Sequence, residues 1–329
     1  MVNYNCEKCG KEFTQKGNYT KHLNKRRPCV NPLEVSETLE VSETPLSEIK
    51  NGCVKFIDLF CGIGSFHYSF KKLNWQCVMS CDIDKAVKET YKENYGLIPH
   101  GDITEIEPKK IPSYDILCAG FPCQPFSQCG QHKGFDDKRG TLFFNIMKFV
   151  EHHKPKVIIL ENVQGLLNHD EGKTFERIKS DIENANYTIS YKVIKCSDYG
   201  LPQMRKRLII LGIRNDTEMV KHIDKLLDFD KYKKETTLTE FLGKNFEKTT
   251  AYTIRCGGKN SPINDKHNWD GYMVDEKEYR LTKEDCLRLQ GFNPDFKLCG
   301  NNKEQWKQLG NTIPTIFTEI IGLNLNKYL

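Results

Sequence analysis

A strand, a glycine turn and a helix follow one another early in the larger part of the chain. Residues 54–60 form an apolar run of strand length, and Gly62 and Gly64 come directly after it. A helical stretch to about Leu73 follows. This order opens the nucleotide-binding unit of doubly wound α/β folds, where glycines let the backbone approach a ligand closely. The pattern therefore predicts an α/β fold with a mostly parallel sheet.

Two acidic residues strengthen the prediction of a nucleotide site. Asp82 stands twenty residues after Gly62, at the end of a second predicted strand (76–81). A carboxylate at this spacing suits the diol of a ribose. Asp102 follows a third short predicted strand, where it suits an adenine amino group or, alternatively, caps a helix. Without Asp82, the glycines would equally fit a plain tight turn.

A cysteine stands in a loop after another apolar run. Cys123 lies in the segment 120–127, which follows the predicted strand 114–118. Pro122 fixes the backbone torsion before the thiol and removes one amide donor. Enzymes of the α/β class place their chemistry in loops at the carboxyl ends of parallel strands. The segment alone leaves two interpretations open, a nucleophile and a buried structural cysteine.

Charged side chains are predicted at the same edge of the sheet. The apolar strand 156–160 leads directly into Glu161, and a buried carboxylate is costly unless it has partners or a function. Arg205 and Arg207 lie between two further predicted strands, where they form a basic cluster or simply a cationic hairpin turn.

The first 31 residues carry a pattern of zinc ligands. A C-x2-C hairpin facing a helix supplies N and S ligands to a tetrahedral zinc ion, and Phe13 and Tyr19 suit its small core. This segment resembles the C2H2 zinc finger, with Cys29 replacing the second histidine after six intervening residues. The expected ligands are Cys6, Cys9, His22 and Cys29. The alternative is a disordered basic tail with chance cysteines.

Charge is distributed unevenly near this end of the chain. Residues 1–31 hold seven Lys/Arg against two Glu, which suits phosphate contacts, although a protein-binding finger remains an alternative. Residues 32–52 repeat Leu-Glu-Val-Ser-Glu-Thr, are acidic, and predict a flexible linker. One finger alone contacts few bases, so it should add affinity rather than specificity.

Composition limits the setting. No apolar run reaches the length of a membrane span, so no membrane partner is expected. The fourteen cysteines are spread along the chain and indicate a reducing, intracellular compartment, cytoplasmic or nuclear.

Several separate blocks, in this order, resemble the cytosine-5 DNA methyltransferases. The resemblance runs from about Phe56 to the C-terminus. Its blocks are residues 58–64, 120–127, 161–163, 203–207, 281–292 and 309–312. It implies a methyltransferase fold of the S-adenosylmethionine-dependent, Rossmann-like type with a small target-recognition domain, acting on double-stranded DNA. A monomer is expected.

The resemblance also implies a mechanism. The Cys123 thiolate adds to C6 of a flipped cytosine, and C5 then takes the methyl group of S-adenosylmethionine. Glu161 holds N3 and the exocyclic amine, while Arg207, with Arg205 beside it, contacts the O2 edge and a nearby phosphate. The base that removes the C5 proton is not identified.

The same resemblance implies which residues contact the cofactor. The expected contacts are Phe60, Gly62, Gly64, Asp82, Ile83, Asp102, Pro122, Asn311 and Thr312. Three positions depart from the family pattern: Ser65 stands where many relatives have glycine, Asp82 replaces a glutamate, and Ile83 replaces an aromatic residue.

Five regions follow: a finger (1–31), a linker (32–52), a catalytic and cofactor-binding domain (53–214), a target-recognition region (215–278) and a C-terminal part that completes the catalytic domain (279–329). The target region holds the basic, glycine-containing segment 255–260, which fits a groove-facing loop or a solvated connector.

Two other functions compete with this prediction. A transfer-RNA cytosine-5 methyltransferase shares the catalytic blocks, but its Cys-Phe-Thr signature is absent and residues 253–256 read Thr-Ile-Arg-Cys. A non-catalytic DNA-binding regulator could keep the fold, although the joint presence of Cys123, Glu161, Arg205 and Arg207 argues against it. The setting stays open between restriction-modification, a virus and a cell's own genome, and the finger favours a eukaryotic or viral one.

Overall fold

The computed structural model of the protein describes residues 4–6, 12–23, 53–122 and 141–329. The chain divides into two compact units, residues 1–52 and 53–329. Within the described ranges, no helix is both long enough and apolar enough to cross a membrane.

The smaller unit contains two short strands and a helix. Strand β1 (Tyr4–Asn5) pairs in antiparallel fashion with β2 (Glu12–Phe13), and α1 (Lys16–Leu23) follows. Cys6 and His22 are both buried. The order strand, strand, helix is the one that the zinc-finger pattern predicts for this segment.

A six-stranded sheet organises the larger unit. Its strands are β3 (Lys55–Leu59), β4 (Gln76–Cys81), β5 (Ile116–Gly120), β6 (Val157–Asn162), β7 (Tyr187–Lys195) and β8 (Lys206–Arg214). The order is β4-β3-β5-β6-β8-β7, and β3 to β6 run parallel while β8 pairs antiparallel with both β6 and β7. The prediction of a mostly parallel sheet is confirmed. The third short strand predicted before Asp102 was wrong, because His100 forms only an isolated bridge with Cys81.

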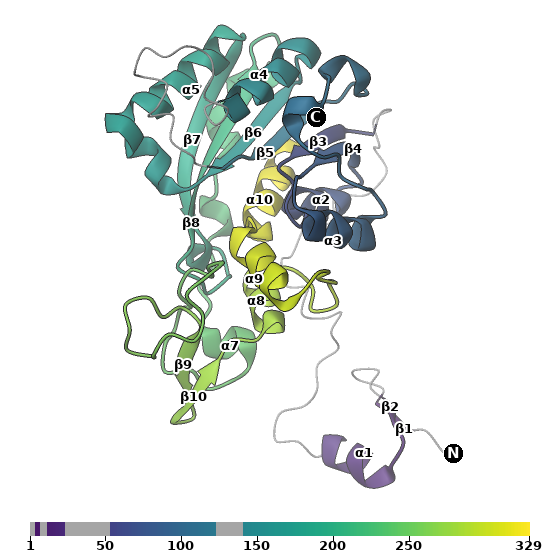
Figure 1. Ribbon diagram of the computed structural model, residues 1–329, viewed down its shortest axis with the longest axis vertical. Coiled ribbons are helices and arrows are strands. Elements are labelled where there is room, and N and C mark those ends of the chain that lie inside the picture. Colours follow the sequence, from purple (N-terminus) through teal and green to yellow (C-terminus); the bar gives the residue numbers. More distant parts are fainter. Residues whose placement is uncertain (1–3, 7–11, 24–52, 123–140) are drawn as a thin grey trace. The chain divides into compact units, whose positions relative to one another are not determined.

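Helices cover both faces of the sheet (Figure 1). One face packs against α4 (Thr141–His153) and α5 (Lys173–Asn184), and the other against α2 (Ser65–Lys71) and α10 (Thr315–Leu325). Neighbouring residues of β3 point to opposite faces, so Ile57 joins the first core and Phe56 the second. The chain therefore forms a three-layer α/β unit, and α10 returns from the C-terminus to complete it.

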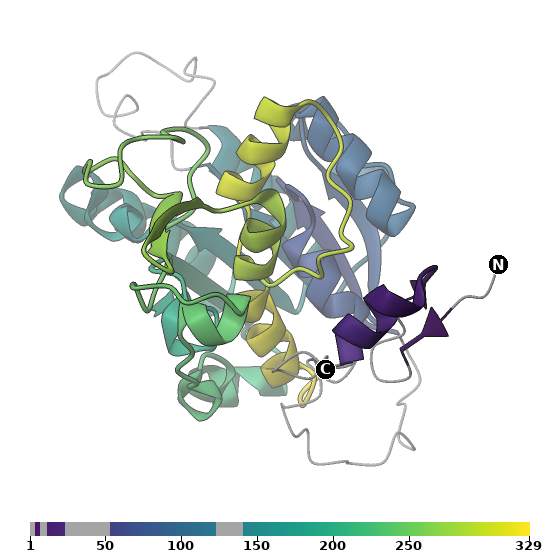
Figure 2. The same ribbon diagram turned by 90° about the horizontal axis from the view of Figure 1, so that it is seen from below.

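A second group of elements lies below the sheet in Figure 1. It contains α7 (Leu238–Leu242), β9 (Gly271–Val274), β10 (Lys277–Arg280), α8 (Lys283–Leu289) and α9 (Asn302–Asn311). A third core around Trp269 holds them together. Figure 2 shows α8 and α9 between the green segment that contains β9 and the blue helix α3 (Lys85–Tyr95).

Short helical turns connect these elements. The 3-10 turns are η2 (Ile103–Glu105), η3 (Pro108–Lys110), η5 (Gln164–Gly172), η6 (Cys196–Asp198), η7 (Glu218–His222) and η8 (Asp230–Tyr232), and α6 (Ile223–Leu226) is a single α-helical turn. Met219, Leu226 and Phe229 pack into the second core of the sheet, so the first part of the 215–278 region is joined to the sheet layer.

Candidate active site

The parallel strands β3 to β6 all end at one edge of the sheet, and β8 begins there. Asn162, the last residue of β6, lies opposite Leu208, so Arg207 stands beside the end of β6. Loops after β3, β4 and β5 meet at this edge. A cavity of about 540 Å³ opens there. The fold therefore brings together side chains from distant parts of the sequence.

The glycine turn after β3 forms one wall of the cavity. Gly62 has a φ of +51°, and its N–H donates to Oδ2 of Asp82 at 3.1 Å. A Cβ atom at Gly62 would meet no protein atom within 4 Å, which leaves room for a ligand. At Gly64 (φ +85°), a Cβ would lie 2.5 Å from Cε2 of Tyr95. Gly64 therefore permits close packing of tyrosine rings and does not line the cavity.

Ser65, where relatives of the resembled family have glycine, joins this turn to the C-terminal part of the chain. Its hydroxyl donates to the carbonyl oxygen of Ile313 at 2.5 Å. The serine side chain is buried, so its hydrogen bond holds the glycine turn to Ile313 without filling the cavity.

Acidic side chains line the cavity near the ends of β3 and β4. Besides the Gly62 amide, Asp82 accepts the N–H of Asp84 at 2.9 Å through Oδ1, and burial raises its pKa although both amides oppose the shift. Asp102 accepts the N–H of Thr104 at 2.9 Å and caps η2. Asp102 therefore caps η2 and lines the cavity at the same time. Ile83 beside them is 75% exposed and offers an apolar surface at the cavity.

The predicted nucleophile follows β5. Pro122 lines the cavity, and Cys123, the next residue, lies outside the described residues. The Asn162 amide donates to the carbonyl oxygen of Phe121 at 3.0 Å. The end of β6 therefore holds the chain where it leaves β5 toward Cys123.

Glu161 and Arg207 form an ion pair in the cavity. Nε of Arg207 lies 2.6 Å from Oε1 of Glu161, and both side chains are largely buried. Burial raises the pKa of Glu161, while the charges of Arg207 and Arg205 oppose this shift. The carboxyl thus takes up a proton more readily than an exposed glutamate.

Arg205 lies behind the cavity and does not line it. Its guanidinium group is fully buried and donates to the carbonyl oxygens of Ile254, Gly310 and Thr312 at 3.1, 3.0 and 2.8 Å. Burial lowers the pKa of Arg205. These acceptors belong to segments far apart in sequence, so Arg205 joins the region around Ile254 to the end of α9.

The end of α9 closes the cavity. Asn311 lines it, whereas Thr312 is buried and its hydroxyl donates to the carbonyl oxygen of Gln308 at 2.8 Å. Sequence analysis missed Lys307, which also lines the cavity and lies 2.7 Å from Asp84 of the α3 cap. No motif pointed to this pair, because it joins elements 223 residues apart.

Most of the predicted cavity residues come together, and a few do not. The predicted residues that line the cavity are Phe60, Gly62, Asp82, Ile83, Asp102, Pro122, Glu161, Arg207 and Asn311. Gly64, Arg205 and Thr312 lie outside its lining. The space above Gly62, the carboxylate of Asp82 and the apolar surface of Ile83 fit a nucleoside-bearing group such as S-adenosylmethionine.

Only part of the predicted zinc site can be located. Cys6 and His22 are described, whereas Cys9 and Cys29 lie outside the described residues. Among the residues that the structure covers, no group of three or more His, Cys, Asp or Glu side chains is placed to hold a metal ion.

Similar proteins identify the family. The model of the C-5 cytosine-specific DNA methylases matches residues 54–273 and 244–327. The Type II methyltransferase M.DsaV of Dactylococcopsis salina is 35% identical over 304 residues, covering 84% of this chain and 87% of that protein. M.HhaI of Haemophilus parahaemolyticus, also a Type II methyltransferase, is 33% identical over 311 residues, covering 84% and 95%.

Solved structures show the same fold at lower sequence identity. S. pombe Dnmt2 methyltransferase superposes with a TM-score of 0.61 at 19% identity, covering 83% of this chain and 99% of that one. A putative DNA modification methyltransferase from an E. coli prophage gives a TM-score of 0.63 at 18% identity, covering 84% and 99%. These two likenesses show the fold. The family model and the two Type II methyltransferases show that the chain belongs to the C-5 cytosine-specific DNA methylases, enzymes that methylate C5 of cytosine in DNA with S-adenosylmethionine.

Proposed function

We propose that the protein methylates cytosine in double-stranded DNA through a covalent bond between Cys123 and a flipped base. The observation that carries the proposal is the Glu161–Arg207 pair, 2.6 Å apart, in the cavity that Pro122 also lines. A carboxyl group and a guanidinium group side by side match the N3 and O2 edge of cytosine. Cys123 follows Pro122 directly in the chain, and we infer that its thiol attacks the same base.

The reaction begins and ends with a free thiolate. The Cys123 thiolate adds to C6, and the displaced electron pair makes C5 nucleophilic. Glu161 in its protonated form donates to N3 and limits the negative charge on the ring, while Arg207 contacts O2. S-adenosylmethionine supplies an electrophilic methyl group and leaves as S-adenosylhomocysteine. C5 then loses its proton to a base, the C6–S bond breaks, and the thiolate is restored.

Cofactor contacts are assigned from the same cavity. We infer that Asp82 binds the ribose diol, Asp102 the adenine amino group and Ile83 the adenine face. Phe60, Gly62 and Asn311 then complete the cavity wall around the rest of S-adenosylmethionine. Gly64, Arg205 and Thr312 support this wall from outside.

Zinc binding by the N-terminal unit is a separate proposal. We propose that Cys6, Cys9, His22 and Cys29 hold one zinc ion. The burial of Cys6 and His22 and the strand-strand-helix order support this assignment. Elemental analysis should find one zinc per chain in the full-length protein and none after Cys6→Ser. Equal zinc contents would contradict the assignment.

We further propose that residues 215–278 are the target-recognition region, between the catalytic domain and its C-terminal part, and that the protein is a monomer that acts inside the cell, in cytoplasm or nucleus. A role in restriction-modification is supported by the names of the relatives, which are Type II methyltransferases. A eukaryotic or viral setting is the alternative that the finger favours. Resistance of DNA from expressing cells to a restriction endonuclease would support the first role.

A single labelling experiment tests the activity. Methyl-labelled S-adenosylmethionine is incubated with duplex DNA and, separately, with transfer RNA, using the wild type and Cys123→Ser. The expected result is 5-methylcytosine in DNA with the wild type and none with the variant. Label on RNA alone would show that the protein is a transfer-RNA cytosine-5 methyltransferase instead. Absence of label with S-adenosylmethionine still bound would favour a non-catalytic regulator.

A further inference from the structure

A long loop lies between Ile254 and β9 and contains neither helix nor strand. We call residues 255–267 the recognition loop. Apart from Ser261 and Ile263, which are half-buried, its residues are exposed. Irregular loops of this length are uncommon in compact domains unless they are functional or disordered. This one is tied down at several points, which argues against disorder.

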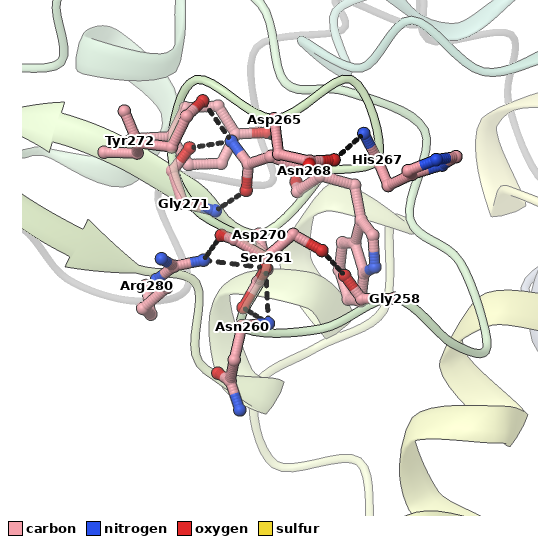
Figure 3. A network of polar contacts seen from close by, with 12 residues as sticks. Gly258, Asn260, Ser261, Asp265, His267, Asn268, Asp270, Gly271, Tyr272 and Arg280 are labelled. Atoms are coloured by element: carbon pink, nitrogen blue, oxygen red, sulfur yellow. Dashed lines mark hydrogen bonds and ion pairs between the residues drawn. The ribbon is translucent and has the colours of Figure 1, made fainter.

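The consecutive buried residues Asn268, Trp269 and Asp270 anchor the loop. Figure 3 shows Asn268 and Asp270 with their hydrogen bonds. The Asn268 amide donates to the carbonyl oxygens of Ile263 and Gly271 at 3.1 and 2.9 Å. The Trp269 indole donates to the carbonyl oxygen of Gly257 at 2.8 Å. The recognition loop is thus hydrogen-bonded at Gly257 and at Ile263 to the buried residues that follow it.

Asp270 is the third anchor and holds the middle of the loop. Its side chain is completely buried and accepts the N–H of Asn260 at 3.1 Å and Nη1 of Arg280 at 3.2 Å. The same Nη1 donates to the carbonyl oxygen of Ser261 at 2.8 Å. A buried ion pair contributes little to net stability, because desolvation offsets the attraction. It does impose one conformation on the backbone around Asn260.

The recognition loop begins at the active-site cavity. The Cys256 thiol lies 2.8 Å from Oδ1 of Asn311, and Asn311 lines the cavity. If the target cytosine occupies the cavity, the neighbouring base pairs must lie beside its rim, because base pairs stack about 3.4 Å apart. The loop therefore starts where the DNA next to the flipped base has to pass.

The proposed function assigns the reading of the DNA sequence to residues 215–278, and the recognition loop is taken as the part of that region that contacts the base pairs beside the target cytosine. We propose that Asp270, which holds this loop through Asn260 and Arg280, is a positioning residue that sets the sequence preference of the enzyme. The proposal rests on the proposed function, since it takes the cavity as the site of the flipped base. Exposed side chains of the loop include Lys259, Asn260, Lys266 and His267.

The chemistry of these side chains suits base edges. Lysine donates to the acceptors of guanine, and asparagine forms paired hydrogen bonds with adenine in the major groove. A loop that is ordered before binding loses less conformational entropy when it meets DNA. Asp270 and Arg280 would thus act on DNA selection without touching the bases.

Asp270→Asn tests the positioning role. The variant keeps the size of the side chain and removes its charge, so Arg280 and the Asn260 amide lose a charged acceptor. Duplexes with randomised bases around a cytosine are incubated with the full-length protein, and both bound and methylated duplexes are sequenced. We expect the preference for the best sequence over its single-base neighbours to fall about tenfold, with S-adenosylmethionine affinity unchanged.

Two further variants make the outcome decisive. Asp275→Asn, in the exposed turn between β9 and β10, is the matched control and should keep the wild-type preference. The double variant Lys266→Ala and His267→Ala changes only exposed side chains, so it tests the loop even if Asp270→Asn fails to fold.

The outcomes separate the two proposals. Unchanged sequence preference in the double variant, or in a folded Asp270→Asn protein, would contradict the proposed role of the recognition loop. A wild type that binds DNA without preference would overturn it as well. Absence of methylation in the wild type would instead refute the proposed function, and the sequenced bound duplexes would still decide the role of the loop.

Discussion

Three carboxyl groups near the active-site edge of the sheet are shielded from solvent: Asp58 and Glu161 are buried and Asp82 is half-buried. Asp58 belongs to β3, Asp82 follows β4, and Glu161 stands in β6. Burial raises the pKa of each, because the charged form loses its hydration. They differ in the partners that offset the loss of hydration. Glu161 has an arginine and Asp82 has two backbone amides. Oδ2 of Asp58 has no hydrogen-bond partner among the described residues.

Asp58→Asn should change how stability depends on pH. The folded pKa of Asp58 is raised by burial and by repulsion from Asp82, so the folded state binds more protons than the unfolded state above the ordinary aspartate pKa. The wild type therefore loses stability as pH rises through the folded pKa of Asp58. Relative to the wild type, the variant should gain free energy of unfolding as pH rises from the ordinary aspartate pKa, about 4, through the raised folded pKa of Asp58. Urea unfolding at several pH values measures this, and parallel curves for the two proteins would contradict it.

Glu161→Gln should abolish most of the catalytic rate. Glutamine keeps the shape but cannot pass a proton, so we expect kcat to fall about 100-fold or more. The wild-type rate should decline as pH rises through the pKa of Glu161, which burial raises, and the variant should lack this decline. Single-turnover methylation across pH measures both. A variant with the wild-type rate and pH profile would show that Glu161 takes no part in catalysis.

Sequence patterns could predict residues at strand ends but not the acceptors of buried side chains. Asp82 and Glu161 follow apolar runs, so their place at the sheet edge follows from strand geometry. The resemblance of block 203–207 to the cytosine-5 DNA methyltransferases predicts Arg205 beside the substrate, whereas the structure places it behind the cavity. Its carbonyl partners Ile254 and Gly310 lie 49 and 105 residues away, and no spacing rule indicates such hydrogen bonds.

At the scale of elements, the end of α9 packs directly on the chain that enters the recognition loop. A Cβ atom at Gly310 would lie 2.4 Å from the backbone nitrogen of Cys256 and 2.5 Å from the carbonyl carbon of Arg255. Backbone atoms cannot rotate away, so one of the two segments has to shift. Arg205 bonds both segments from behind, so a shift there would also strain its hydrogen bonds.

Gly310→Ala should therefore weaken cofactor binding and stability together. Overpacking of this kind costs about 1–3 kcal/mol, and Asn311 beside it lines the cavity. Calorimetric titration with S-adenosylmethionine and thermal unfolding measure the two effects. Gly165→Ala is the control, since a Cβ there meets no atom within 4 Å. Equal affinity and melting temperature in both variants would show that α9 and the loop can separate freely.

Element prediction succeeded where periodicity was strong and failed where a turn lacked its usual residues. The helical stretch predicted after the glycine turn, to about Leu73, is confirmed as α2. The β9–β10 hairpin was missed, because its turn places Asp275 and Glu276 at φ +49° and +60° without glycine or asparagine. The usual sequence signal of a two-residue hairpin turn was therefore absent.

At the scale of the whole molecule, the smaller unit contains a basic segment that the family match does not cover. The family match covers only the larger unit, residues 53–329, so the smaller one is an addition to the enzyme. Residues 1–31 hold seven Lys/Arg against two Glu, which favours attraction to DNA without much sequence preference. On the proposed function, methyl transfer and sequence selection belong to the larger unit, and we expect the smaller unit to add affinity for DNA.

Removing residues 1–52 should therefore leave kcat and sequence preference unchanged while raising the KM for DNA. The logarithm of DNA affinity should also fall less steeply with the logarithm of salt concentration, by about 0.9 for each phosphate that the finger neutralises in the full-length protein. Methylation kinetics at several salt concentrations measure the change, and full-length Cys6→Ser should resemble the truncated protein if zinc holds the finger together. Unchanged KM and salt slope in the truncated protein would leave the finger free to bind protein instead. A loss of sequence preference would show that the smaller unit contacts bases, and specificity would then have to be divided between the finger and the recognition loop.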